Sequence, residues 1–496
     1  MDERRTPVLV GVAQWIGPDV DPREAATPLD AMEHVVRAAS DDAGVGARAL
    51  ADVEVIGVAG SVGLRTWNAP RPLAERLAAR PRREIVTAIG GEMHLDLVGH
   101  LAREIEAGRL RSALVASTHN MRTLRRARKE GVALDWSAAG EGRAELFGVD
   151  RPGASDAERA YGLDRPSSVY PIFENALRAH RGLDVETHRR RMGALLSSFT
   201  RVAAANPHAW FPVERSADEI TRPSADNRMV ALPYTKYMNS VMETDQAAAA
   251  WLTSAAYARA LGISEDRWVY VRGGSTAEEH PWFPTERPDF AACPALRDAV
   301  RGALAQAGAA LEDIDAIDLY SCFPVAVEMA CEMLGLDESD PRGLTVTGGL
   351  PYAGGPGNGY TTHSLAAMVE RLRERPGALG LLTGNGWYLT KHSALVCSTA
   401  PREKSGAPSM PGPVGEAVRC CAQASGSGRI ETWTVLYDRE GTPERGIVVG
   451  RLEGGERFLA NTPPDRQVLE ALAEGEQIGR TGRVVHADGR NRFDPA

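Results

Sequence analysis

The feature that most constrains this fold is an internal repeat, with a spacing of about 260 residues between its two copies. Ala295–Gly308 (ALRDAVRGALAQAG) lines up with Ala31–Gly44 (AMEHVVRAASDDAG), and an apolar strand follows each segment. A helix and strand in residues 364–384 likewise parallel residues 99–117. Matching element order and partial identity indicate a duplication. Two α/β halves of this kind would bury a shared core and leave a crevice at the strand ends.

The first half alternates helices with continuously apolar strands, which is typical of a sheet that helices cover on both faces. The patterns predict strands at Val8–Ala13, Val53–Val58, Ile85–Ala88 and Ser112–Ser117, and helices at Thr27–Gly44, Pro70–Arg80 and Leu95–Glu106. From about residue 120 to 226 the sequence becomes irregular and polar. This stretch is too long for a simple loop, so it predicts an inserted subdomain, with a helix at Leu183–Ala204. After it, the alanine-rich stretch Gln246–Leu261 predicts an apolar helix.

These patterns predict three units, namely residues 1–265 with the insert, residues 266–403, and residues 414–496. Lys404–Pro413 (KSGAPSMPGP) predicts a linker, because it is rich in Pro, Gly and Ser and has no periodicity. Beyond it, alternating stretches such as Ile430–Tyr437 (IETWTVLY) predict short strands. We therefore expect a small C-terminal β-rich domain of the oligonucleotide/oligosaccharide-binding type.

Composition limits the function classes. A net charge of −9 provides no general basic field for nucleic acid or an anionic membrane. The densest basic run, Arg122–Lys129, predicts a solvated helix face, with phosphate binding as the alternative. No apolar run is long enough for a transmembrane helix, and VLVGVAQ near the N-terminus predicts a strand rather than a signal peptide. Six cysteines without a paired framework indicate a reducing, cytoplasmic environment.

The segment Thr345–His363 (TVTGGLPYAGGPGNGYTTH) has six glycines and two prolines among its nineteen residues. Glycine permits positive φ and close backbone approach, and proline fixes turns. A loop of this kind ahead of the helix predicted at Ser364–Arg373 favours ligand binding, with a long surface turn as the alternative. We expect ligand contacts from Tyr352, Gly354, Gly355, Asn358, Tyr360 and, in the later turn TGNGW, Asn385.

The two halves, the insert, the loop GGLPYAGGPGNGY and the segment YSCF together resemble the thiolase superfamily over about residues 6–400. The resemblance is greatest to sterol-carrier-protein-type thiolases, whose HDCF and GHP segments are similar to Tyr320–Phe323 and Gly354–Pro356. The C-terminal strings IETWTVLYDREG and GIVVGRL resemble the extra domain of thiolase-like proteins of type 1. The resemblance implies a duplicated α-β-α-β-α layered fold and C–C bond chemistry next to a thioester.

The residues that thiolases need are mostly replaced here. The position of the nucleophilic cysteine, at the start of the helix after the third strand, corresponds to Gly91, and the first cysteine of the chain is Cys293. Gly355 replaces the histidine of GHP, and Tyr320 replaces the histidine of HDCF. Of the family's groups only Cys322 remains, at the position of the proton-transferring cysteine. Covalent acyl transfer needs a thiolate near a helix N-terminus, so we do not expect ordinary thiolysis.

Three hypotheses follow for the function. The first is a degenerate thiolase-like protein of the acetyl-CoA acetyltransferase family that binds an acyl-CoA or acyl ligand without thiolysis. The second is a retro-aldol lyase that acts on a β-hydroxyacyl-CoA with tyrosine as acid and base, similar to thiolase-like aldolases of steroid side-chain breakdown. Those aldolases work with a separate oligonucleotide-binding-fold partner, whose part the C-terminal domain would play. The third is a non-catalytic interaction scaffold.

Candidate catalytic residues are Tyr320 and Cys322, which share one side of an extended segment, and His94, near the vacated nucleophile position. The alternative is a packed core tyrosine, an inert buried cysteine and a structural histidine. His119 and Asn120 follow a strand end, and His363 caps a helix in the simplest interpretation. The spacing of the histidines predicts no metal site. We expect no covalently bound cofactor; a coenzyme A thioester is the expected substrate or ligand, and a monomer and a dimer both stay open.

Overall fold

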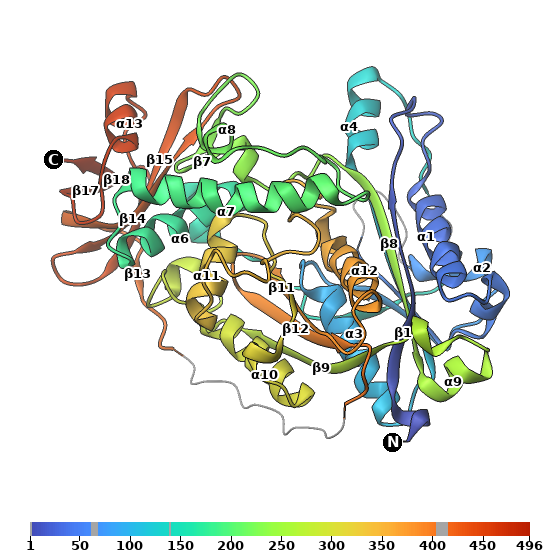
Figure 1. Ribbon diagram of the computed structural model, residues 1–496. Coiled ribbons are helices and arrows are strands. Elements are labelled where there is room, and N and C mark those ends of the chain that lie inside the picture. Colours follow the sequence, from blue (N-terminus) through green and yellow to red (C-terminus); the bar gives the residue numbers. More distant parts are fainter. Residues whose placement is uncertain (1, 61–67, 138–139, 403–414) are drawn as a thin grey trace.

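The computed structural model describes residues 2–60, 68–137, 140–402 and 415–496, so the predicted linker Lys404–Pro413 lies outside the described residues. Ten strands form one sheet in the order β10-β11-β12-β9-β1-β8-β4-β2-β3-β5 (Figure 1). Their bounds are β1 Pro7–Ile16, β2 Val55–Val58, β3 Arg83–Thr87, β4 Ser112–Asn120, β5 Glu145–Phe147, β8 Asp245–Ser254, β9 Val269–Glu278, β10 Ala316–Asp318, β11 Leu379–Gly386 and β12 Lys391–Ser398.

The strand order contains the repeat that the sequence predicts. In the first half the order is β1-β8-β4-β2, and in the second half it is β9-β12-β11-β10. The halves join where β1 and β9 pair antiparallel, with Val8 opposite Tyr270. Since helix–strand segments aligned in the sequence occupy equivalent places in the two halves, the duplication extends to the topology.

Helices lie in three layers around this sheet. Helices α3 (Met93–Glu106) and α12 (Tyr360–Arg373) pack against strands of both halves, and their apolar side chains share one hydrophobic cluster. Helices α1 (Pro28–Asp42) and α2 (Pro70–Arg76) cover the outer face of the first half. Helices α10 (Pro294–Ala307) and α11 (Pro324–Leu334) cover that of the second half. The thiolase-like α-β-α-β-α layering is therefore confirmed.

One predicted element is wrong. Residues 246–261 form not one helix but strand β8 followed by the short helix α9 (Ala255–Ala260). Strand β8 pairs with β1 on one side and β4 on the other, and all ten of its residues are buried. Ala247, Ala249 and Trp251 enter one hydrophobic cluster, whereas Ala250 and Leu252 enter another. In a central strand both faces are apolar, so the sequence lacks the polar alternation that distinguishes a strand from a helix.

The chain between β4 and β8 forms the insert, which packs over the second half. Its elements are α4 (Met121–Glu130), α5 (Asp156–Tyr161), α6 (Pro166–His180), α7 (Val185–Ala205), α8 (Ala217–Thr221), β6 (Met229–Ala231) and β7 (Tyr234–Thr235). The predicted long helix is confirmed as α7, which begins after Asp184, whose side chain accepts from the Thr187 amide at 2.7 Å. Figure 1 shows α7 lying across the molecule above α11 and α12. Side chains of α6 and α7, including Tyr170 and Phe199, join the cluster that contains Tyr320.

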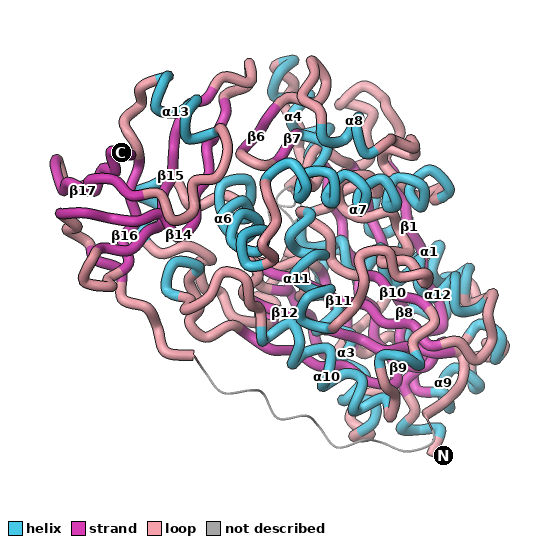
Figure 2. Tube along the Cα trace, turned by 60° about the vertical axis from the view of Figure 1, so that its left-hand side comes forward, coloured by secondary structure: helices cyan, strands magenta, loops and turns pink. Residues whose placement is uncertain are grey.

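The predicted C-terminal β-rich domain is confirmed and lies at one end of the molecule (Figure 2). Strands β14, β15, β16, β18 and β17 pair in turn and close into a ring. Strand β14 also pairs with β6 of the insert, so the insert and this domain share a sheet. The elements are β13 (Cys420–Cys421), β14 (Gly426–Tyr437), β15 (Pro443–Leu452), β16 (Arg457–Asn461), α13 (Arg466–Ala473), β17 (Thr481–Ala487) and β18 (Arg490–Pro495).

None of the helices in the described part of the chain combines the length and the hydropathy that crossing a bilayer requires.

Candidate functional site

The hydroxyl of Tyr320 lies against Gly91, the residue that the resemblance to thiolases aligns with their nucleophile. Gly91 lies just before α3 in the first half, and Tyr320 follows β10 in the second half, where its amide donates to the Thr383 hydroxyl at 2.9 Å. A Cβ built on Gly91 would overlap the Tyr320 hydroxyl and would lie 2.6 Å from Cζ of the same ring. No side chain therefore fits at residue 91 while Tyr320 keeps this position. The crevice between the halves is closed at this point by a phenol.

Three further side chains meet at this centre. The amide of Asn385 donates to the Tyr170 hydroxyl at 2.9 Å, and it lies 3.9 Å from Sγ of Cys322. The Tyr170 hydroxyl in turn donates to the carbonyl of Trp387 at 2.9 Å. Burial raises the pKa of the Cys322 thiol to about 12, so this cysteine stays a thiol near neutral pH. The predicted residues Tyr320, Cys322 and Asn385 are thus brought together, and Tyr170 of the insert joins them.

The position of the GHP histidine is also occupied. A Cβ on Gly355 would overlap Oγ of Ser240 and would lie 3.1 Å from the carbonyl of Val241. At Gly354 the φ angle is +107°, and a Cβ there would lie 2.8 Å from Cδ of Gln246. Both glycines therefore allow the end of the insert and the start of β8 to approach the loop. There is no room for an imidazole on residue 355.

Tyr360 and Asn358, two further predicted ligand residues, form hydrogen bonds that fix the glycine-rich loop in place. The Tyr360 hydroxyl lies 2.7 Å from Oγ1 of Thr347 and donates to Asp318 at 3.3 Å. Burial raises the pKa of Asp318 to about 6. The side chain of Asn358 accepts from the Gly90 amide at 3.0 Å and donates to the Gly60 carbonyl at 3.2 Å, so it bridges the loop to the first half. Tyr352 is buried, and its hydroxyl has no partner among the described residues.

The histidines differ in their surroundings. Nδ1 of His94 lies 2.5 Å from the hydroxyl of Thr362 on α12, and burial lowers the His94 pKa to about 3. His94 therefore stays neutral between the two central helices. Nε2 of His119 lies 2.9 Å from the carbonyl of Met242, beside the loop residue Gly357. Its place at the strand end is as the sequence predicts.

A second thiol does not complete a thiolase pair at Cys322. Cys397 lies in strand β12, and its side chain belongs to the central cluster around α3 and α12. Cys322 belongs to the cluster of the second half's outer face. Burial raises the pKa of Cys397 to about 12. The two thiols thus lie in different layers.

Sequence reasoning missed a buried ion pair next to Gly91. The ammonium of Lys391 lies 2.7 Å from Oε1 of Glu92, and both side chains are nearly inaccessible to solvent. Burial raises the Glu92 pKa to about 7, against the opposing effect of Lys391. Gly384 and Gly386 give Glu92 its space, because their Cβ atoms would lie within 2.7 Å of it. A single sequence carried no signal for this pair, since its members lie on different elements.

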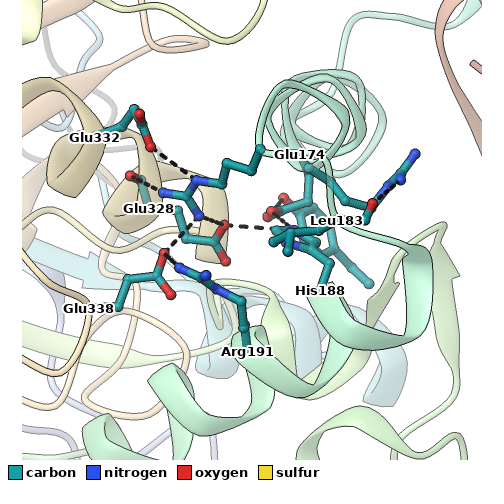
Figure 3. Close-up of polar contacts among 10 residues, drawn as sticks. Glu174, Leu183, His188, Arg191, Glu328, Glu332 and Glu338 are labelled. Carbon is teal, nitrogen blue, oxygen red and sulfur yellow. Dashed lines mark hydrogen bonds and ion pairs between the residues drawn. The ribbon is translucent and has the colours of Figure 1, made fainter.

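Two buried groups of metal-type side chains also come together only in the fold. Figure 3 shows the group around His188, whose Nε2 lies 2.6 Å from Glu174 and 3.6 Å from Glu328. Arg181 donates to Glu328 at 3.0 Å. The other group is Glu279, Cys293 and His392, in which Sγ and Nε2 are 3.2 Å apart. Hydrogen bonds and ion pairs already account for many of these polar atoms.

The contact between residues 91 and 320 makes a mutational prediction. Gly91→Ala is expected to lower the free energy of unfolding by about 1–3 kcal/mol, because the new methyl group overlaps the tyrosine. In the background Tyr320→Ala the same change is expected to cost less, with a coupling energy of about 0.5–3 kcal/mol. Urea unfolding of the four proteins of this double-mutant cycle measures the coupling.

Gly454→Ala is the matched control, because a Cβ at Gly454 would meet no atom within 4 Å. It is expected to change the free energy of unfolding by less than about 0.5 kcal/mol. Additive costs for Gly91→Ala and Tyr320→Ala would show that the two residues do not exclude each other.

The buried carboxyl groups predict a pH dependence of stability. Burial raises the pKa of Glu92 and of Glu174 from the ordinary value of 4.5 to about 7. Between about pH 4.5 and pH 7 the folded protein therefore holds protons on these carboxyl groups that the unfolded chain releases. Their contribution to the stability of the folded state is complete below about pH 4.5 and is lost as the pH rises towards 7. Glu92→Gln is expected to make the fall in unfolding free energy between pH 5 and pH 7.5 smaller. A tenfold change in proton affinity corresponds to about 1.4 kcal/mol.

Urea unfolding at several pH values, with Glu474→Gln as an exposed control, measures this slope. The control is expected to keep the wild-type slope. An unchanged slope in Glu92→Gln would mean that Glu92 is ionised in the folded protein at pH 5.

Comparisons with known proteins agree with this architecture. Residues 414–490 match the family model described as the additional C-terminal domain of thiolase-like protein type 1. The Ltp2-ChsH2(DUF35) aldolase superposes with a TM-score of 0.59 at 16% identity, covering 81% of this chain and 99% of that one, which is a likeness of fold alone. No curated protein matches the chain.

A similar solved structure covers the whole molecule. It is a monomeric SCP2-thiolase-like protein type 1 from Mycobacterium smegmatis, with a TM-score of 0.85 and 33% identity over 99% of this chain and 100% of that one. The matched region takes in both halves, the insert and the C-terminal domain. The chain therefore belongs to the SCP2-thiolase-like protein type 1 family.

Proposed function

We propose that this protein binds an acyl-CoA or a related acyl ligand without performing thiolysis. The observation that carries the proposal is the phenol of Tyr320 against Gly91, at the place where a thiolase has its nucleophile. A covalent acyl-enzyme needs a thiolate there, and no side chain is available to supply one. Ser240 fills the place of the second catalytic group at Gly355.

The remaining thiol at the centre does not restore that chemistry. With a pKa of about 12, Cys322 is ionised in only about one molecule in 10⁵ at pH 7. The thiolate is the nucleophilic form of cysteine, so nucleophilic attack by Cys322 would be correspondingly rare. Its neighbours Asn385 and Tyr170 are neutral hydrogen-bonding groups, which suit a carbonyl or hydroxyl oxygen.

Side chains beside the glycine-rich loop support a ligand with both apolar and anionic parts. Phe211 and Met242 are 43% and 51% exposed. The Phe211 amide donates to the Tyr352 carbonyl at 2.8 Å, which places it beside the glycine-rich loop. Next to these side chains stands helix α4, whose Arg122 guanidinium lies 4.8 Å from the ring of Trp210. The arginines of α4 and its one lysine, Lys129, offer charge for the phosphates of coenzyme A, and the exposed apolar side chains offer contact for its pantetheine and acyl parts.

The proposal also includes the oligomeric state, the cellular location and the metabolic role of the protein. A monomer is proposed because the solved relative is monomeric and because β5 of the insert pairs with β3 and covers that edge of the sheet. A cytoplasmic location is proposed because all six cysteines are free thiols. A role in lipid metabolism follows from the proposed ligand class, whereas acyltransferase activity does not.

Binding is the direct test of this proposal. Acetyl-CoA or a longer acyl-CoA is expected to raise the melting temperature, because a ligand at one hundred times its Kd stabilises the folded state by about 2.7 kcal/mol. Incubation with acetoacetyl-CoA and coenzyme A is expected to give no thiolysis and no acylated protein in intact mass spectrometry. A covalent acyl adduct would contradict the proposal, and so would the absence of any shift with coenzyme A and its esters.

The double variant Arg128→Gln/Lys129→Gln locates the ligand. Both side chains are exposed on α4, and each exposed ion pair contributes about 0.2–1 kcal/mol, so the Kd is expected to rise about 2- to 30-fold. The matched control Arg419→Gln/Arg439→Gln removes the same charge from exposed sites in and near the C-terminal domain. An equal change in both proteins would place the ligand away from α4.

A retro-aldol lyase is the second candidate, and the convergence of phenols with Glu92 favours it. Burial, with smaller effects from Cys322 and Glu92, raises the Tyr320 pKa well above its ordinary value of 10. The phenol therefore stays protonated and can exchange its proton with a substrate oxygen or carbon. In this reaction a base takes the β-hydroxyl proton, the Cα–Cβ bond breaks, and the electron pair enters a thioester enolate that is then protonated.

Tyr320→Phe separates the two candidates. If the protein is a lyase, cleavage of 3-hydroxyacyl-CoA is expected to fall about 10²- to 10⁴-fold in the variant, while binding of the ester is retained. Carbonyl product release and ester binding are measured in parallel on both proteins. Equal cleavage rates in the two proteins would show that this tyrosine takes no part in the mechanism. The absence of cleavage by the wild-type protein would contradict the lyase hypothesis.

A further inference from the structure

A small buried cavity lies beside the reaction centre on the far side of Tyr360. Its volume of about 10 Å³ has room for about one water molecule. Side chains from four regions line it, among them Gln14 of β1, Gln246 of β8, His363 of α12 and His208 after α7. It is thus built from both halves and the insert, like the centre itself.

Three polar atoms of these lining side chains have no partner in the described part of the chain. They are Nε2 of Gln14, Oε1 of Gln246 and Nε2 of His363. Gln246 is 2% exposed and His363 is 4% exposed, so solvent at the surface does not satisfy them. A buried polar group is costly to leave without a hydrogen bond, so three such atoms at one cavity point to a shared partner.

The contacts of the same side chains fix which atoms donate and which accept. Nδ1 of His363 lies 3.0 Å from Oε1 of Gln14, and because an amide oxygen only accepts, Nδ1 carries the hydrogen. Nε2 of a neutral His363 is therefore an acceptor. The Gln246 amide nitrogen donates to the Ala353 carbonyl at 2.9 Å, which leaves its oxygen as a second acceptor. The free Gln14 nitrogen is a donor.

The charge state of His363 further restricts the chemical class of the ligand. Burial lowers the His363 pKa to about 3, with His208 and His119 acting in the same direction, so the imidazole stays neutral. A carboxylate or phosphate brings no hydrogen for the two acceptors, and an ammonium group accepts nothing from Gln14. A water molecule donates twice and accepts once, which matches all three atoms, and an alcohol hydroxyl donates once and accepts once, which matches the Gln14 nitrogen and one of the two acceptors.

We propose that this cavity is a binding site for one neutral hydroxyl group, supplied by a water molecule or by a bound ligand. Nε2 of His363 accepts a hydrogen bond from this group. Tyr360 lines the cavity, and its ring centroid lies 5.3 Å from that of Tyr320. The ring of Tyr360 therefore lies between a hydroxyl group held here and Tyr320. The space exists because residue 354 is a glycine, since a Cβ there would overlap Oε1 of Gln246.

Joint X-ray and neutron crystallography of the wild-type protein at pH 7 tests the site without any substitution. The expected result is one ordered water within hydrogen-bond distance of all three atoms, with deuterium on Nδ1 of His363 and none on Nε2. An empty cavity, deuterium on Nε2, an ion in place of water, or Gln14 and Gln246 turned to satisfy each other would overturn the proposal.

Soaking with 3-hydroxybutyryl-CoA or butyryl-CoA distinguishes the two sources of the hydroxyl. If the ligand supplies it, the hydroxyl replaces the water, and the hydroxylated ester binds about 5- to 10-fold tighter, as expected for one added hydrogen bond. If solvent supplies it, the water stays with both esters and their affinities are equal. This arm rests on the function proposed above. If neither ester binds, that function fails, and the crystal of the unliganded protein alone decides the present proposal.

Discussion

The contact between the Tyr320 phenol and Gly91 is the constraint on which the candidate site depends. Gly91 precedes α3 of the first half and Tyr320 follows β10 of the second, so the contact closes the crevice where the duplicated halves meet. The glycine is required because any Cβ would overlap the phenol. A side chain of the second half thus occupies the space beside Gly91 of the first half. The glycine at residue 91 and the tyrosine at residue 320 are therefore sterically matched.

The same region concentrates buried carboxyl groups whose pKa values burial raises into the range from about 6 to 7. Glu92 and Asp318 lie on opposite halves, and each contacts the frame around Tyr320 and Tyr360. Their burial costs stability as they ionise near neutral pH, and a fold seldom retains such groups in a site that does nothing. Glycines at 384 and 386 exist in part to make room for Glu92. The site is filled with polar side chains rather than with the apolar side chains of an ordinary core.

The C-terminal domain is part of this construction and not a tethered module. Asn175 of α6 donates to the Trp433 carbonyl at 2.8 Å, and the same helix carries Tyr170 to the reaction centre. The buried guanidinium of Arg457 donates to the carbonyl of Thr285 at 2.9 Å. Such bonds leave unpaired buried groups if the domain moves away, so docking of this domain and the position of Tyr170 are coupled through α6.

The sequence by itself determined the duplication, the layered fold and the small β-rich domain, since these depend on local patterns. It failed at β8, because a central strand that is apolar on both faces has no periodicity to distinguish it from a helix. It selected Tyr320, Cys322 and Asn385, which the fold brings together. Only the tertiary structure decided that Ser240, Tyr170 and Glu92 join them, and that Asn358 and Tyr360 brace the loop. These contacts join residues far apart along the chain, and packing rather than sequence spacing sets which of them meet.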